Sequence, residues 1–178
     1  MTDDPSKTRL LVLHDYGMGS AWWWVHARSE REVLETFADV EVVHDEETRA
    51  RAEGWGLDEA DVDGPVDPPG LDGCRADREA HRDLPGFGTL VGPDPLYLRR
   101  RWAEDGETTT YLLEVDSAGR RLRQVEVEED GQAFRSTPDD WPFNPPWLDR
   151  YSPEWLPFVI TAPEFEQEWA DARYDPER

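Results

Sequence analysis

Residues 97–135 read YLRRRWAEDGETTTYLLEVDSAGRRLRQVEVEEDGQAFR. Apolar and polar residues alternate along this stretch, and segments that contain Asp and Gly separate the apolar runs. Alternation with a period of two is typical of half-buried strands, and Asp/Gly segments between such strands favour hairpin turns. The stretch therefore predicts an antiparallel meander as the scaffold of the second half of the chain.

The meander also holds the densest group of positive charges in the chain, with three arginines on one predicted strand and three on another. Because side chains alternate along a strand, we expect Arg99 and Arg101 to share one face of the sheet. By the same rule we expect Arg121 and Arg123 to share a face.

Two interpretations of these arginines are open. Cross-strand glutamates can neutralise them in exposed ion pairs, each worth about 0–1 kcal/mol; the nearest candidates are Glu114, Glu126 and Glu128. Alternatively, guanidinium groups gathered on the sheet can bind a small phosphate or carboxylate. The residues of such an anion site are Arg99, Arg101, Arg121 and Arg123.

The chain as a whole is strongly acidic, with a net charge of -22 that its two halves share about evenly. A field of this sign repels nucleic acid and anionic membranes and attracts cationic partners. The acidity is either a general feature of solubility or salt tolerance, or a surface that fits a basic protein. Nine Trp, six Phe and five Tyr supply large apolar side chains, which argues against a disordered chain.

Cys74 is the only cysteine, so no disulfide can form within the chain. The first residues are acidic and lack the charged start and apolar centre of a signal peptide. No apolar run approaches the roughly 18–20 residues that a membrane helix needs. We therefore expect a cytoplasmic protein that has no membrane partner.

Residues 8–53 predict a ββαβα unit. Leu10–Leu13 and Trp22–Ala27 read as two strands of a hairpin, because aromatic and β-branched residues favour strands. Both faces of the second strand are apolar, so we expect it to be covered on both sides. A third strand is predicted over residues 40–43, with a polar helix after it over residues 45–53.

Two capping boxes mark the starts of helices, since a Ser or Thr is followed three residues later by Glu in each. Ser29 and Glu32 predict a helix that ends near Asp39. Thr161 and Glu164 predict a final helix whose buried face carries Phe165 and Trp169.

Two other segments are rich in turn-forming residues. Residues 54–95 hold eight of the 13 glycines and six prolines, and they predict an irregular connector in which residues 75–82 form one or two helical turns. Residues 137–159 are rich in Pro and aromatic residues and predict a loop laid across the sheet, with its rings buried. The predicted fold is α+β, an antiparallel sheet of two hairpin or meander units with a few helices on one side. Residues 8–53, the connector and residues 96–174 are expected to pack as one globular unit.

Residues 97–172 resemble a small bacterial domain family of unknown function, which pairs a meander with a C-terminal helix. The resemblance rests on the strands and turns of the meander and on the closing motif from Ile160 through Thr161, Glu164 and Phe165 to Trp169. It implies the fold and carries no catalytic or binding residue. Domains of this type resemble the accessory and immunity proteins encoded beside bacterial toxins.

The remaining motifs give weak signals of chemistry. Gly17-Met18-Gly19 follows a strand but lacks the third glycine of a dinucleotide loop, so a tight hairpin turn is expected. His14-Asp15 and His44-Asp45 both end predicted strands, and they can meet if those strands pair side by side. We predict no catalytic residue, no metal site and no cofactor.

The aromatic residues suggest where a partner protein binds. Trp is enriched at the centres of interfaces, and the candidates for partner contact are Trp22, Trp24, Trp141 and Trp147. Our first hypothesis is a non-enzymatic, acidic protein that binds another protein and no nucleic acid. The alternatives are an enzyme or small-anion binder that uses the arginines and the His-Asp pairs, and a structural subunit of a larger assembly.

Overall fold

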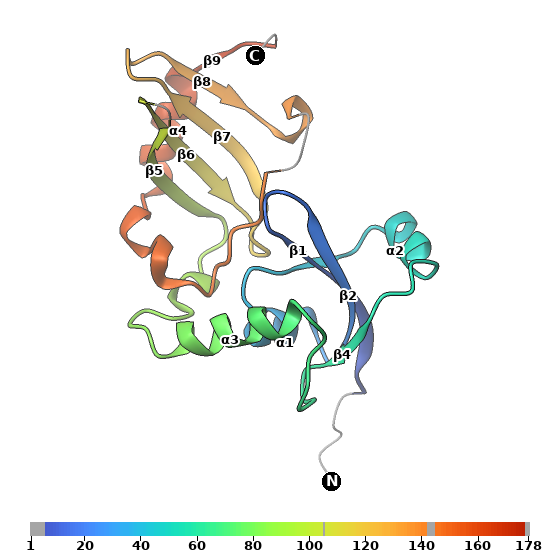
Figure 1. The fold of residues 1–178 in the computed structure, drawn as a ribbon. Helices are drawn as coiled ribbons and strands as arrows, with labels where there is room; N and C mark the ends of the chain where they lie inside the picture. The colour runs from blue at the N-terminus through green and yellow to red at the C-terminus, as the bar shows by residue number, and fades with distance from the viewer. Residues whose placement is uncertain (1–5, 105, 142–144, 177–178) are drawn as a thin grey trace. The chain divides into compact units, whose positions relative to one another are not determined.

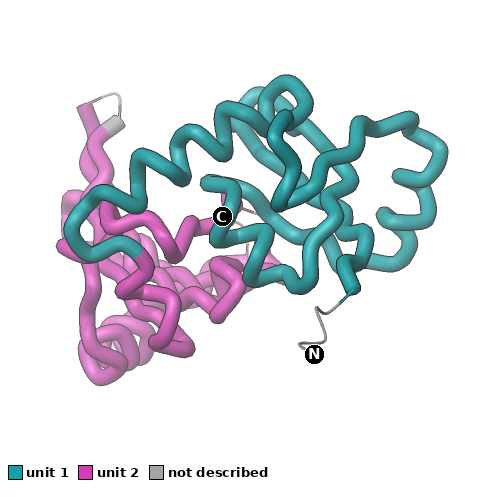
Figure 2. Tube along the Cα trace, turned by 90° about the horizontal axis from the view of Figure 1, so that it is seen from below, with its two compact units in different colours: residues 1–87 teal, residues 88–178 magenta. Residues whose placement is uncertain are grey.

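The computed structural model describes residues 6–104, 106–141 and 145–176. The chain divides into two compact units, unit 1 over residues 1–87 and unit 2 over residues 88–178 (Figure 2). Each unit contains one mainly antiparallel sheet with helices (Figure 1). The predicted α+β class is therefore confirmed.

The sheet of unit 1 has the strand order β3-β1-β2-β4. Strands β1 (Thr8–Asp15) and β2 (Ser20–Ala27) form the predicted antiparallel hairpin. Strand β3 (Glu41–Val43) pairs antiparallel with β1, and β4 (Glu59–Asp61) pairs parallel with β2. The order of elements up to residue 53 is the predicted ββαβα.

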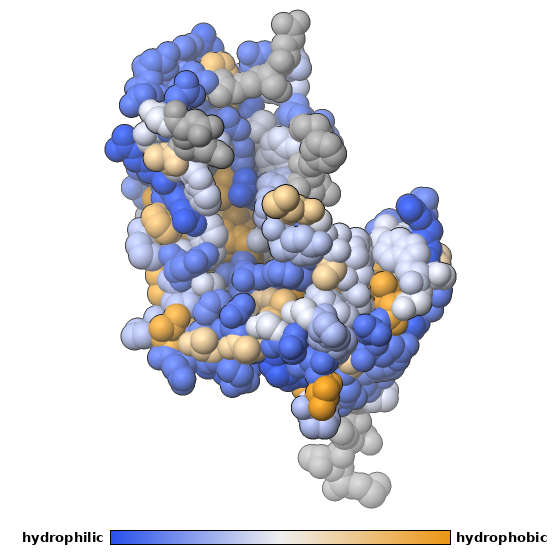
Figure 3. All heavy atoms as spheres, in the orientation of Figure 1, coloured by the Kyte–Doolittle hydropathy of each residue, from blue (hydrophilic) through white to orange (hydrophobic). Residues whose placement is uncertain are grey.

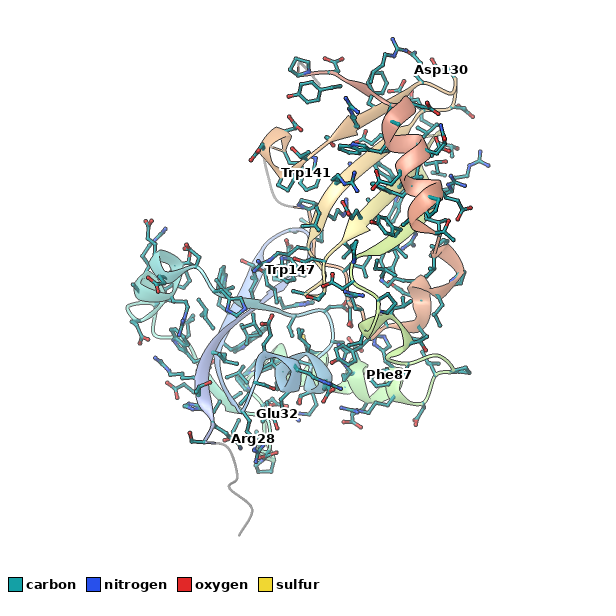
Figure 4. The ribbon with its side chains drawn as sticks, turned by 180° about the vertical axis from the view of Figure 1, so that it is seen from behind. Arg28, Glu32, Phe87, Asp130, Trp141 and Trp147 are labelled. Carbon is teal, nitrogen blue, oxygen red and sulfur yellow. The ribbon has the colours of Figure 1, made fainter. Side chains whose placement is uncertain are left out.

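Three α-helices belong to unit 1, namely α1 (Glu30–Thr36), α2 (Glu46–Ala52) and α3 (Leu71–Arg82). The Ser29 hydroxyl caps α1 by accepting a hydrogen bond from the backbone amide of Glu32, as predicted. The Glu32 carboxylate reaches back one residue further than in a capping box, to the amide and side chain of Arg28 (Figure 4).

Strand β2 is covered on both faces, as its composition predicts. On one face Trp23 and Val25 pack in a core with Phe37 of the α1 C-terminus and Leu71 of α3. On the opposite face Trp24 packs with residues that include Ala52 of α2. The consecutive tryptophans thus serve two separate apolar clusters.

The stretch predicted as an irregular connector is largely ordered. It contains β4, the twelve-residue helix α3 and a short 3-10 helix, η1 (Thr89–Val91). Residues 75–82 are helical, as predicted, but the helix begins four residues earlier, and it buries Leu71, Cys74 and Arg78 at helical spacing. Buried contacts on that stripe stabilise α3 despite Gly73, and the abundant turn residues lie mostly on either side of the helix.

The sheet of unit 2 has the order β5-β6-β7-β8-β9. Strands β5 (Leu96–Glu104), β6 (Glu107–Val115), β7 (Arg121–Val127) and β8 (Ala133–Ser136) form the predicted antiparallel meander. A two-residue strand, β9 (Arg173–Tyr174), adds parallel to β8 near the C-terminus, which the sequence pattern did not predict.

Helix α4 (Ala162–Asp171) covers one face of this sheet, hereafter the α4 face. The predicted capping box is complete, because Thr161 accepts from the Glu164 amide while the Glu164 carboxylate accepts from Thr161. Phe165 and Trp169 stack against each other over the sheet, with ring centroids 6.1 Å apart.

The opposite face, hereafter the η3 face, is covered by the proline-rich segment. The segment contains two 3-10 helices, η2 (Pro138–Asp140) and η3 (Pro153–Phe158), and η3 lies on this face. Trp155 and Phe158 of η3 pack on a core that contains Leu98 and Leu113, as the predicted aromatic loop requires. Residues 142–144 of that loop lie outside the described residues.

Candidate functional site

The arginines of the meander are divided between the two faces of the sheet. The pairing of β6 with β7 shifts between Glu114 and Val115, so that Arg123 lies opposite Glu114 while Arg121 lies opposite Val115. A bulge inserts one extra residue and changes the alternation of side chains on its strand. The prediction that Arg121 and Arg123 share a face is therefore wrong.

On the α4 face, ion pairs neutralise Arg99 and Arg123. The Arg123 guanidinium pairs with Glu114 across the strands, with one contact of 3.1 Å, and with Glu166 of α4 at 2.5 Å. Hydrogen bonds to these two carboxylates raise the pKa of Arg123, and the bond from Arg123 lowers the pKa of Glu166. Arg99 pairs with Glu168 of α4 at 3.1 Å. This is the neutralisation by neighbouring glutamates that the sequence offered as one of two interpretations.

On the η3 face, aromatic rings surround Arg100. Its guanidinium carbon lies 4.4 Å from the ring of Trp102, 4.8 Å from Trp155 and 5.1 Å from Phe158. A guanidinium over aromatic rings gains cation–π stabilisation without a counter-charge. The described residues supply no ion pair to Arg100.

Arg121 also lies on the η3 face, where it is half-buried. It donates a hydrogen bond of 2.9 Å to the side-chain oxygen of Gln124, while its Nε finds no partner among the described residues. Burial lowers the pKa of Arg121, and the nearby Tyr111 and Glu126 partly oppose this. The structure thus does not bring the four candidate arginines together in one anion pocket.

The candidate tryptophans differ in exposure. Trp24 is 2% exposed and lies beneath the Arg9 guanidinium at 4.0 Å, so it belongs to the core of unit 1. Trp22 is half-buried and meets the partly exposed Trp55 edge to face, at 5.3 Å. In unit 2, Trp141 and Trp147 lie after β8 and are half-buried (Figure 4). Trp22, Trp141 and Trp147 therefore keep some surface, and Trp24 keeps almost none.

The two His-Asp pairs do not come together. Strands β1 and β3 pair antiparallel, which places His14 at one end of that pairing and His44 at the other. His14 Nδ1 lies 2.8 Å from the carbonyl oxygen of Asp39, and His44 Nε2 lies 2.9 Å from a Glu30 carboxylate. The strands pair side by side, but their antiparallel direction keeps the two pairs apart. The two Asp residues have the local roles that the sequence also allows: Asp15 accepts from the Gly17 amide in the turn, and Asp45 caps α2 by accepting from the Thr48 amide.

Other sources of chemistry are also limited. In the described part of the chain, no group of three or more His, Cys, Asp or Glu side chains could hold a metal ion. Burial, together with the charges of Asp39 and Asp77, raises the pKa of the Cys74 thiol to about 12. Cys74 is 5% exposed and is therefore not a nucleophile near neutral pH.

Two arginines that the sequence did not single out have specific positions in unit 2. Arg150 is 4% exposed and donates to the backbone carbonyls of Leu90, Pro93 and Asp116, which fastens three separate segments. Burial lowers the pKa of Arg150. In the sequence, only its place within an apolar, proline-rich stretch could have indicated that Arg150 is buried.

The second is Arg135, which lines a pocket of about 250 Å³ at the end of α4. The Arg135 guanidinium donates to the carbonyl of Trp169 at 3.3 Å and makes no ion pair with a described carboxylate. Asp140 accepts from the Thr137 amide and from the Tyr174 hydroxyl, and these bonds lower its pKa. The pocket is lined by Arg135, Ser136, Thr137, Asp139, Asp140, Trp169 and Tyr174.

Exposed apolar residues are scattered. On the face shown in Figure 3 they form separate spots on a mostly hydrophilic surface. At the turn between β1 and β2, which is the predicted hairpin turn, Tyr16 is 60% and Met18 is 96% exposed. On β5, Trp102 is 47% exposed. These side chains are available to a partner without opening the core.

No protein-family model, curated protein or solved structure matches this chain. The resemblance of residues 97–172 to a small bacterial domain family therefore stays a prediction. Among residues 6–104, 106–141 and 145–176, no helix is long and apolar enough to cross a membrane.

Proposed function

We propose that this protein is a non-enzymatic, acidic binding protein whose partner is another protein with a basic surface. The proposal rests on the charge balance of the folded chain, on its exposed aromatic side chains and on the chemistry of its ionisable groups. An accessory or toxin-immunity role is the more specific form of this proposal.

The observation that carries the proposal is the internal use of the basic side chains. At least eight of the 19 lysines and arginines pair with carboxylates of the described chain, from Lys7 with Asp61 to Arg123 with Glu114. The others in these ion pairs are Arg9, Arg28, Arg31, Arg75, Arg82 and Arg99. Because the chain has 41 acidic residues, many carboxylates remain to face solvent. A negative field of this kind speeds encounter with a cationic partner.

Exposed side chains of the type found in interface centres accompany this field. Tyr16 and Met18 extend from one hairpin turn, and Trp102 lies on the edge of the other sheet. Aromatic residues and Met are enriched in the desolvated centres of interfaces. Charge thus supplies the rate of encounter, and these residues supply the buried contact.

The test is a pull-down from the organism that encodes the protein, at low and at moderate salt, followed by binding kinetics with the captured protein. We expect a basic partner whose association rate falls steeply as salt rises, because screening shortens the range of the field to about 8 Å at 0.15 M. Absence of a partner at both salt concentrations, with the purified protein an inert monomer, would contradict the proposal. Co-purification at a fixed stoichiometry at every salt concentration would instead favour a structural subunit.

The immunity form of the proposal has its own test. If a toxin gene lies beside the gene of this protein, co-expression of the two should restore growth of cells that the toxin alone arrests. Growth arrest that persists at matched expression of a folded protein would reject this role and leave the general binding role intact.

A second candidate function is the binding of a small anion, which the pocket beside Arg135 favours. The Arg135 guanidinium makes no ion pair with a described carboxylate and lies 5.5 Å from the Trp169 ring, so it can bind a small phosphate or carboxylate, against the repulsion of Asp139 and Asp140 in the same lining. A thermal-shift screen with inorganic phosphate, nucleotides and small carboxylates should raise the Tm of the wild type and not that of Arg135→Gln. The matched control is Arg173→Gln, which replaces an exposed arginine of the adjacent strand β9. Equal shifts in both variants, or no shift in the wild type, would reject this candidate.

A further inference from the structure

Strand β5 is an edge of its sheet, since β6 is its only neighbour in the strand order. In an antiparallel pair, successive residues direct their backbone groups alternately toward the partner strand and away from it. The carbonyl of Tyr97 accepts a hydrogen bond from the Ile160 amide, so Tyr97 is directed outward. By alternation, Arg101 and Ala103 are directed outward as well.

The chain itself covers only the first part of this edge. An isolated antiparallel bridge joins Leu98 to Val159, and the chain then enters α4 after Ile160. Beyond this bridge, the described residues supply no partner for the outward amide and carbonyl groups of Arg101 and Ala103. Both residues are exposed. Residues 159 and 160 therefore pair with the first part of the β5 edge, and the described residues leave the outward backbone groups of residues 101 and 103 without a partner.

The side chains along the open part differ on the two faces. On the α4 face, Arg101 is exposed and the described residues provide it no ion pair, whereas Arg99 is held by Glu168. On the η3 face, Trp102 is 47% exposed and rests against Arg100. A strand laid along this edge would meet a free positive charge on one side and an aromatic ring on the other.

We propose that the open edge of β5, residues 101–103, binds an extended segment of a partner protein by strand addition. The segment alternates acidic residues, which face Arg101, with apolar residues, which face Trp102. Backbone hydrogen bonds hold such a segment, and alternate side chains select it. This inference rests on the proposed binding function: the partner is basic over most of its surface, and the one strand that it adds to this edge is acidic and apolar in alternation.

Charge argues against a second copy of this chain as the occupant. In the antiparallel pairing that overlaps two such edges, Arg101 lies opposite Ala103, and the two Arg101 side chains lie diagonally across the same face, where like charges repel. Charged side chains on an edge strand are a known barrier to such self-pairing. An acidic segment experiences the opposite local sign, and at 0.15 M salt the overall negative field is screened beyond about 8 Å.

The direct test uses two synthetic peptides with capped ends, Val-Glu-Val-Glu-Val-Glu-Val and the same peptide with Lys in place of Glu. At 0.15 M salt, the acidic peptide should bind at least about tenfold more tightly than the basic one. It should also slow hydrogen exchange of the Arg101 and Ala103 amides, measured by NMR. Equal binding of the two peptides, no binding of the acidic one, or protection confined to other amides would overturn the inference.

Variants distinguish binding at the β5 edge from a general effect of protein charge. Ala103→Pro removes an outward amide that β6 does not use, so the sheet should keep its Tm while peptide binding falls at least about tenfold. Arg101→Glu should have a similar effect, and Arg120→Glu, an exposed arginine in the β6–β7 turn with the same change of charge, should not. If a natural partner is captured but binds the Ala103→Pro and Arg101→Glu variants unchanged, this inference fails while the proposed function stands. If the acidic peptide binds as described but no partner is captured, the proposed function fails and the edge is still a strand-binding surface.

Discussion

The α4 face and the η3 face of the unit 2 sheet hold arginines from the same strands in different ways. On the α4 face, Arg99 and Arg123 are neutralised by three carboxylates, one from β6 and two from α4. On the η3 face, Arg100 is enclosed by three aromatic rings, and Arg121 donates to the side-chain oxygen of Gln124. One face thus uses opposite charge and the other uses polarisable or dipolar groups.

This difference sets how each face responds to its surroundings. Exposed ion pairs weaken with salt and with protonation of the carboxylate. Contacts of a guanidinium with rings or carbonyls contain no group that titrates between pH 3 and 9. Changes of charge, salt concentration and pH should therefore alter the stability of the contacts on the two faces to different extents.

The largest effect is expected from Arg123→Ala, because it removes the cation that pairs with Glu114 and leaves that carboxylate with a hydrogen bond of 3.3 Å from the Tyr97 hydroxyl. Glu114 is 8% exposed, and removal of one member of a buried ion pair costs about 3–5 kcal/mol. Partial exposure of Arg123 places the expected loss near the lower end, at about 3 kcal/mol. Urea denaturation at pH 7 measures this loss.

The control also replaces the Glu114 carboxylate, which Arg123→Ala deprives of its ion pair. Arg123→Ala combined with Glu114→Gln should recover part of the lost stability, because a neutral amide is less costly to bury than a charge. If the double variant is as unstable as the sum of the single variants, packing of the Arg123 stem over Phe165 and Trp169 explains the loss instead.

A smaller expected effect compares one arginine from each face of the sheet. Arg100→Gln should lower the free energy of unfolding by about 1–2 kcal/mol, because the contact with the aromatic rings is lost. Arg99→Gln should lower it by about 0–1 kcal/mol, because the exposed ion pair with Glu168 is lost. In 1 M salt the cost of Arg99→Gln should shrink toward zero, while that of Arg100→Gln should persist. Equal salt sensitivity of the two variants would show that the faces do not differ in the way described.

Local signals in the sequence predict much of this fold. The caps at Ser29 and Thr161 involve residues within three positions of one another, so the sequence contains the whole interaction. The hairpin of β1 and β2 and the four-stranded meander likewise depend on alternation and on nearby turns. The covering of both faces of β2 follows from its unbroken apolar sequence.

Features that depend on distant contacts were not predicted. The bulge beside Val115 moves Arg121 to the other face, and no residue type in β7 marks it. The short strand β9 exists because the end of α4 returns the chain to β8, where Phe134 pairs with Arg173 and Arg135 with Tyr174. Arg150 is defined by three carbonyls that are brought together only by the fold. The candidate anion site depended on the alternation that the bulge interrupts.

The smallest expected effect is a pH dependence on the α4 face alone. The hydrogen bond from Arg123 lowers the pKa of Glu166 in the folded state below its ordinary value of 4.5. A lowered folded pKa adds stability that is complete above the unfolded pKa and is lost as pH falls through the folded value. Glu166→Gln should therefore cost less than about 1 kcal/mol from pH 5.5 to 8, because half of the Glu166 side chain is exposed.

Below pH 4.5 the wild type and Glu166→Gln should converge, as shown by urea midpoints measured from pH 3 to 7. In an Arg123→Ala background, Glu166→Gln should have no effect at any pH, since the donor that lowers the pKa is absent. Arg100→Gln, on the η3 face, should show a cost that is constant across the same range. A constant cost of Glu166→Gln down to pH 3 would mean that packing, and not charge, joins α4 to the sheet.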